Sequence, residues 1–343
     1  MDTKEMLKDK GFNLDQYGVV GTNEECAMAM DAALITTPNA GIPVEVLTSF
    51  NERAIKVLTE KRAATEIFNE RKFSDRAELI KKVRLVEATG YTQPYSDYSD
   101  NGKSGINYEF VPRENYLFET VIKYGDLEQE MVAKAKANLL ADLQASAALN
   151  IAIDFNKFYM RGVEGLDNYG IINAPGLPAA ITAAAVTVGG GSHTEWSYKS
   201  GAEIYQDIVA MMSNMSGRAG GHVDMLTKYK LVVGPSVYAE LAKQNALGTE
   251  TVIDMIKRSF RNLEVVVAPE YDDDASAASG VQRMAQLIAV EIDGQPTGEL
   301  GFSEKFSAGR VVPFMSYHAQ KFMAGTYGAV IYRPVFITTM LGV

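Results

Sequence analysis

Residue types that carry out chemistry are scarce in this sequence, and they do not stand at catalytic spacings. Only three histidines occur, none of them in an H-E-x-x-H pattern or another metal-ligand arrangement. The G-x-S-x-G, Walker A and G-x-G-x-x-G motifs are also absent from the sequence. We therefore expect no catalytic residue, no bound metal and no cofactor. The histidines are His193, His222 and His318.

Three other features have a chemical interpretation and a simpler one. Asp272–Asp274 could bind a divalent cation, but an acidic run of this kind is more often a solvated loop. Cys26 follows Glu24 and Glu25, so it lacks the positive surroundings of a reactive thiolate. The run Gly189–Ser192 precedes no phosphate-binding turn and is typical of a flexible loop.

The composition indicates a large soluble protein. The chain has 343 residues, 47% of them hydrophobic, which is enough for a substantial core. Its formal charge of −10 argues against nucleic-acid binding by the chain as a whole, and its single cysteine excludes a disulfide framework. We find no signal-peptide pattern and no apolar run near the roughly 18 residues that span a bilayer. We expect a protein that is made in a cytoplasm and does not bind a membrane.

The first third of the chain predicts an extended segment, a helix and a long β-hairpin. Residues 35–43 contain two prolines and a glycine, and residues 44–61 have helical spacing. Apolar residues alternate over 106–110 and 116–124, and a strand at 79–87 can pair back against them. The polar stretch 91–105 is the predicted hairpin tip. A lone two-stranded ribbon is marginally stable in water, so this one must pack on its own body or on another copy.

Residues 126–161 predict one long helix. The stretch contains no glycine or proline, and Asp126 can cap it with Gln129 at the capping-box position. At 1.5 Å per residue it would be about 54 Å long. Its apolar residues recur every four positions, which predicts contact with different neighbours along its length. An ordinary core helix with breaks is the alternative, and Gly162 or Gly165 would end it.

The segment LDNYGIINAPGLPA, residues 166–179, follows that helix and combines chain-breaking residues with apolar ones. Asn, Gly and Pro recur through it, whereas a purely solvated loop would not need its Tyr, Ile and Leu residues. We call residues 166–179 the corner. An α/β region is predicted next. Its elements are helices at 201–215 and 236–243, a helix capped by Thr251 and Asp254, strands at 230–235, 263–269 and 283–292, and mostly strand from 302 to 343.

The order of these elements resembles the major capsid proteins of tailed bacteriophages, which have the Hong Kong 97-like fold. The stretches that carry the resemblance are YGIINAPG after the long helix, KLVVGPSVY, LEVVVAPEY and the terminal GTYGAVIYRP. The resemblance covers nearly the whole chain and implies an α+β fold in five parts. These are an N-terminal arm (1–62), an extended β-hairpin loop (63–125), the spine helix and corner of a peripheral domain (126–171), an α/β axial domain (172–298) and return strands of the peripheral domain (299–343).

The same resemblance implies assembly and no catalysis. Hexamers and pentamers of the chain would close an icosahedral shell around double-stranded DNA, held without sequence-specific binding. The portal, with scaffolding or decoration proteins, would be the other partners, and the virion would be the final location. The hairpin tip would contact a neighbouring subunit, and the corner would join the spine helix to the axial domain. The tip residues are Tyr91, Pro94, Tyr95, Tyr98 and Lys103, and the corner residues are Tyr169, Gly170, Asn173, Pro175 and Gly176.

Three points stay open at the level of sequence. Some members of the family form an isopeptide bond from a loop lysine, and Lys103 is the only lysine between Lys82 and Lys123, although a solubilising role is simpler. An encapsulin-type compartment shares the fold, but its chain is usually shorter, with a short hairpin. A cytosolic α/β enzyme with dispersed acidic residues is the alternative from another class.

Overall fold

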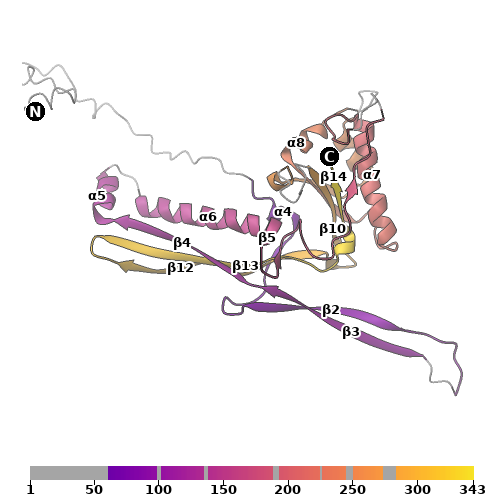
Figure 1. Ribbon diagram of the computed structural model, residues 1–343, viewed down its shortest axis with the longest axis horizontal. Helices are drawn as coiled ribbons and strands as arrows, with labels where there is room; N and C mark the ends of the chain where they lie inside the picture. Colours follow the sequence, from indigo (N-terminus) through magenta and orange to yellow (C-terminus); the bar gives the residue numbers. More distant parts are fainter. Residues whose placement is uncertain are drawn as a thin grey trace, which may run out of the picture. The chain divides into compact units, whose positions relative to one another are not determined.

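The computed structural model describes residues 61–98, 102–134, 138–187, 193–224, 226–244, 250–272 and 283–343 (Figure 1). The chain divides into two units, Met1–Leu58 and Thr59–Val343, and all the described residues belong to the second. Most of the predicted arm, including the helix expected at 44–61, lies outside the described residues. So do Gly189–Ser192 and Asp273–Asp274.

A six-stranded sheet forms the predicted α/β region, in the order β7-β14-β10-β8-β9 with β11 beside β10. Strands β8 and β9 are parallel, whereas β10 runs antiparallel to both β8 and β14. The helices α7, α8 and α9 belong to the same α/β region as this sheet. The bounds are β7 Ile181–Thr182, α7 Gly201–Arg218, β8 Lys228–Val233, α8 Pro235–Glu240, α9 Val252–Ser259, β9 Leu263–Val267, β10 Met284–Ile292, β11 Gln295–Pro296 and β14 Ile337–Leu341.

Both faces of this sheet are buried, which explains the continuous apolar runs of its strands. Leu231 of β8 and Leu287 of β10 pack with α7 and α9 in one core. Val232 and Ile288, one residue further along the same strands, belong to a second core that includes residues of the helix α6, Leu139–Arg161. Successive side chains of a strand point to opposite faces, so β8 and β10 each contribute side chains to both cores.

A four-stranded sheet carries α6 on one face, in the order β1-β12-β13-β4. Phe118 of β4 meets Phe155 of α6 edge-to-face, with ring centres 5.1 Å apart. Phe322 of β13 is buried in the same core. The bounds are α4 Ala64–Ile67, β1 Glu70–Lys72, β4 Tyr116–Gly125, β12 Gly298–Pro313 and β13 Tyr317–Ile331, with short strands β5 Gly162–Val163 and β6 Asn168–Tyr169 pairing after α6.

The predicted hairpin exists, but it is shorter than expected. Strand β2, Ile80–Tyr91, pairs antiparallel with β3, Lys103–Glu114, in a separate two-stranded sheet. The alternating stretch at 116–124 is a strand, β4, yet it pairs with β13 and not with β2. The buried Asn115 ends the hairpin, where its backbone N–H donates to Leu79 O at 2.7 Å. The predicted hairpin was therefore wrong in its last strand, 116–124.

The single long helix was also wrong. The stretch forms α5, Asp126–Lys134, and α6, which begins after Asn138. Asn138 adopts a non-helical conformation, and its side-chain oxygen accepts from Ala141 N at 3.2 Å, so it caps a new helix. With 23 residues, α6 is about 35 Å long. Gly162, at φ 72°, ends α6 as predicted.

Two further predictions need correction. Helix α5 begins at Asp126 itself, and Glu128, not Gln129, reaches back to accept from Gly125 N at 3.4 Å. The expected helix to Lys243 ends at Glu240. The capping box of Thr251 and Asp254 is confirmed, since the Thr251 side chain accepts from Asp254 N at 3.3 Å. Of the terminal strands, β12 and β13 belong to the four-stranded sheet, with β13 beside β4, whereas β14 joins the six-stranded sheet. The domain boundaries themselves stay a prediction.

Candidate interaction surfaces

The β2–β3 hairpin has one apolar face. Register places Val86 opposite Tyr108 and Ala88 opposite Ile106, with Phe110 next along the same side. Val86, Ile106, Tyr108 and Phe110 are 54%, 57%, 57% and 56% exposed. We call Val86, Ala88, Ile106, Tyr108 and Phe110 together the apolar hairpin face. Contiguous exposed apolar surface of this kind marks interaction sites.

The opposite face of the same hairpin is more polar in its middle part, while nearer the root Val83 pairs with Val111. Glu87 pairs with Asn107, and Leu85 with Glu109. The difference follows from the sequence, because residues two apart in a strand share a face. On the apolar side, the Arg84 guanidinium lies 5.6 Å from the centre of the Tyr108 ring. The Tyr108 side chain remains more than half exposed beside this cation–π contact.

The predicted tip residues are all exposed. Tyr91 pairs with Lys103 at the last rung of the ladder, and Pro94 lies in the connection beyond it. Tyr95 and Tyr98 are 91% and 100% exposed. Within the described part of the chain, these side chains meet no other segment that would bury them, so their contact with a neighbour stays a prediction.

Three of the predicted corner residues, Tyr169, Gly170 and Asn173, lie against the end of α6, whereas Gly176 lies near Pro334. Asn173 links the two segments: its Oδ1 accepts from Gly170 N at 2.7 Å, and its Nδ2 donates to Arg161 O at 2.8 Å. Gly170 lies so close to the helix that a Cβ there would stand 2.2 Å from Met160 O. Gly176 has φ 78°, and Pro175 beside it is exposed. Glycine is thus required at position 170 by space and at position 176 by conformation.

The corner also meets the root of the hairpin, which the sequence did not indicate. Arg113, at the end of β3, is only 4% exposed, and its guanidinium lies 5.1 Å from the centre of the Tyr169 ring. Burial lowers the pKa of Arg113. Asn168 is buried, and its Nδ2 donates to Glu114 O at 3.2 Å and to Thr326 O at 3.0 Å. An arginine and an asparagine in polar local sequence give no signal of burial.

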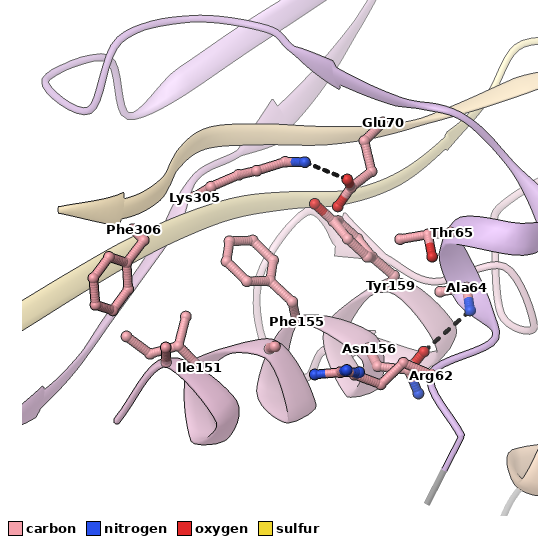
Figure 2. Close-up of a pocket in the computed structure, with 12 residues that line it drawn as sticks. Arg62, Ala64, Thr65, Glu70, Ile151, Phe155, Asn156, Tyr159, Lys305 and Phe306 are labelled. Carbon is pink, nitrogen blue, oxygen red and sulfur yellow. Dashed lines mark hydrogen bonds and ion pairs between the residues drawn. The ribbon is translucent and has the colours of Figure 1, made fainter. Parts of the chain in front are cut away.

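A cavity of about 400 Å³ lies among α4, α6 and β12 (Figure 2). Ile151 and Phe155 of α6 and Phe306 of β12 form much of its apolar lining. Figure 2 shows the Tyr159 hydroxyl directed toward Glu70, which forms an ion pair with Lys305. Burial, and then the Glu70 charge, raise the pKa of Tyr159. The phenol therefore stays neutral.

The histidines and Asp272, the first residue of the acidic run, have structural partners. His193 stacks on Tyr198, His222 Nδ1 lies 3.1 Å from Asp293 Oδ2, and His318 Nδ1 lies 3.2 Å from Asp126 Oδ1. The Asp272 carboxylate accepts from Ser236 N at 2.9 Å, at the start of α8. Among the residues that the structure describes, no three His, Cys, Asp or Glu side chains gather as a metal site. Within the same ranges, no helix has the length and apolar character of a membrane span.

Solved structures with this architecture are viral capsids and related particles. The capsid of Myoviridae Phage XM1 matches with a TM-score of 0.68 at 13% identity, over 89% of this chain and 100% of that one. The capsid of a native GTA particle matches with a TM-score of 0.60 at 13% identity, over 90% and 99%. The capsid of cyanophage P-SCSP1u matches at 0.54 and 10% identity, over 88% and 95%. The α+β fold is therefore the Hong Kong 97-like capsid fold, as predicted.

Residues 33–342 match the family model of the Pa193 gp26 major capsid protein, and the chain belongs to that family. No curated protein sequence matches it. The chain is thus a phage major capsid protein, a non-enzymatic subunit that self-assembles with its own copies into the icosahedral shell of a tailed phage. Its location in the virion capsid is likewise confirmed, and the family decides against the encapsulin and enzyme alternatives.

Proposed function

We propose that the apolar hairpin face and the hairpin tip of each subunit lie on a neighbouring copy, and that this contact closes the copies into hexamers and pentamers. The observation that carries the proposal is the asymmetry of β2 and β3. One face has four large apolar side chains more than half exposed, and the other carries Glu87, Asn107 and Glu109.

The energetics favour a partner for this face. Full burial of a large apolar side chain stabilises by about 1.5–3 kcal/mol, so four of them supply a substantial drive for association. The hairpin is a separate two-stranded sheet, so both of its outer edges also have free backbone hydrogen-bonding groups. A neighbouring copy can bury the apolar face and, at the same time, form hydrogen bonds with one edge strand. The exposed Tyr91, Tyr95 and Tyr98 extend the same contact at the tip.

The remaining parts receive roles consistent with this assembly. The proposed domain division keeps 1–62 as the arm, 63–125 as the extended loop, 126–171 and 299–343 as the peripheral domain and 172–298 as the axial domain. The shell would enclose double-stranded DNA without sequence-specific contacts, which suits a net charge of −10. A portal, with scaffolding or decoration proteins, would complete the particle.

The test is to shorten the tip while keeping the ladder. Replacing residues 91–103 by Asn-Gly gives a two-residue turn after the Gly90–Ser104 pair. We expect a folded subunit with an unchanged melting temperature that fails to form shells in negative-stain micrographs. Deleting residues 273–280, which lie outside the hairpin, is the matched control and should leave assembly intact. Shells formed by the shortened chain at the yield of the unmodified chain would refute the contact.

A further inference from the structure

The root of β3 is bound to the corner by backbone-directed hydrogen bonds. Glu114 N donates to Asp167 O at 3.1 Å, and Asp167 N donates back to Glu114 Oε2 at 3.3 Å. The Asn168 side chain donates to Glu114 O at 3.2 Å from the next position. Three bonds to one residue leave this end of β3 little freedom to swing or twist relative to the corner.

The root of β2 is held at a different place. Asn115 Nδ2 donates to Glu78 O at 3.3 Å, and the Tyr327 hydroxyl donates to the same carbonyl at 2.9 Å. Asn115 is itself held from β12, because Ser303 Oγ donates to Asn115 Oδ1 at 3.0 Å. The two strands of the hairpin are therefore held at separate points, which opposes both bending and rotation of the ribbon.

Arg113 is buried inside the contact between the hairpin root and the corner, which we call the joint. Its guanidinium is buried and stacks over Tyr169 at 5.1 Å, and its NH1 donates to Pro112 O at 3.0 Å. Asn168 ties the joint to β13 through Thr326 O. Burying a cation is costly unless it gains a partner in place of water, and the Tyr169 ring supplies that partner, so its loss should weaken the packing of Arg113 in the joint.

We propose that Arg113, Asn168 and Tyr169 are positioning residues that form a socket for the hairpin and fix its direction relative to α6 and the four-stranded sheet. In this role the corner does more than join α6 to the segment that follows it. Every copy then presents its apolar hairpin face at the same angle. The consequence for assembly rests on the hairpin contact proposed above, whereas the socket itself can be measured in the unassembled subunit.

The experiment measures the direction of the hairpin directly. In the full chain with Cys26→Ser, spin labels at Ser104 of β3 and Lys157 of α6, both exposed, report the distance between hairpin and helix. Tyr169→Leu removes the aromatic face but keeps apolar bulk, and we expect it to widen the distance distribution about twofold. Tyr169→Phe keeps the ring and loses only the hydroxyl, which donates to Asp167 Oδ1 at 3.3 Å. This variant should therefore show the same narrow distance distribution as the unmodified residue.

Tyr198→Leu is the matched control, because Tyr198 is an exposed ring that stacks on His193 away from the joint. We expect it to leave the distribution unchanged. A Tyr169→Leu subunit that stays folded with the original narrow distribution would overturn the socket. Arg113→Met provides a second route to the same result if Tyr169→Leu fails to fold. A widened distribution with normal shell formation would support the socket and contradict the hairpin contact instead.

Discussion

The guanidinium of Arg113 lies 5.1 Å from the centre of the Tyr169 ring, so the root of the hairpin rests directly on the corner that follows α6. These two residues stand on segments that the sequence presents as separate features, an extended loop and a helix-terminating turn. Their contact means that a change in the corner is transmitted to the part of the subunit that we expect to meet a neighbour. Some substitutions should then change the stability of the subunit, and others should change only its assembly.

A charge on the apolar hairpin face should block assembly without unfolding the subunit. Ile106→Asp places a carboxylate on the apolar face, and Asn107→Asp places the same charge on the polar face one residue away. Both positions are exposed, so the free energy of unfolding should change by about 0.5 kcal/mol or less in each. Sedimentation should show shells only for Asn107→Asp. Equal loss of shells in both variants would point to general charge effects.

Gly170 should not tolerate a side chain. A Cβ at this position would lie 2.2 Å from Met160 O and 2.3 Å from Arg161 N, and backbone atoms cannot move aside as a side chain can. We expect Gly170→Ala to lower the free energy of unfolding by about 3 kcal/mol or more. Gly217→Ala, in α7 with nothing within 4 Å, should raise it by about 0.5–1 kcal/mol. Denaturant titration of the two variants checks both signs.

The buried ion pair of Lys199 and Asp207 should matter far more than an exposed one. Their side chains are 1% and 4% exposed, and Trp196 Nε1 also donates to the Asp207 carboxylate at 2.9 Å. Lys199→Met leaves that carboxylate buried without its cation, which should cost about 3–5 kcal/mol of the free energy of unfolding. Lys157→Met, which removes an exposed pair with Asp154, should cost about 0.5 kcal/mol or less. Equal effects in a denaturant titration would contradict this.

Glu203 should make the stability of α7 depend on pH. Hydrogen bonds from the Thr187 hydroxyl, and then from backbone N–H groups and the Ser200 hydroxyl, lower its pKa from 4.5 to about 2. Because the folded-state pKa is depressed, the stabilisation is present above pH 4.5 and is lost as the pH falls toward 2. Glu203→Gln should therefore melt about 1–2 °C lower at neutral pH, a small effect because the group is partly exposed. The difference should shrink in scans at successively lower pH and would be constant if Glu203 were uninvolved.

The sequence predicted most element types and failed mainly on their partners. Alternation over 116–124 shows which side chains share a face, but it carries no information about which strand lies alongside. The true partner, β13, is about two hundred positions away in the chain and pairs through Tyr317–Thr326. The apolar runs Leu231–Val233 and Val265–Val267 were easier to predict, because a strand with both faces covered needs apolar residues at consecutive positions.

The sequence does carry a signal for the start of α6. Asn138 stands directly before Leu139 and Leu140, and an asparagine before an apolar periodic run is a typical N-cap. The socket had no such signal. Burial of Arg113 and Asn168 depends on Tyr169 and β13 meeting the hairpin root, and only the folded chain brings these segments together. The cavity beside Tyr159 likewise forms from α4, α6 and β12, which are distant in sequence.

A reconstruction of shells assembled from the full chain, at a resolution that shows side chains, tests the central claim most directly. The account predicts that Val86, Ile106, Tyr108 and Phe110 of each subunit are buried against a neighbouring copy, with the hairpin leaving its own subunit at the angle set by Arg113 and Tyr169. An apolar hairpin face that is folded back on its own subunit, or left in solvent between the copies, would contradict it.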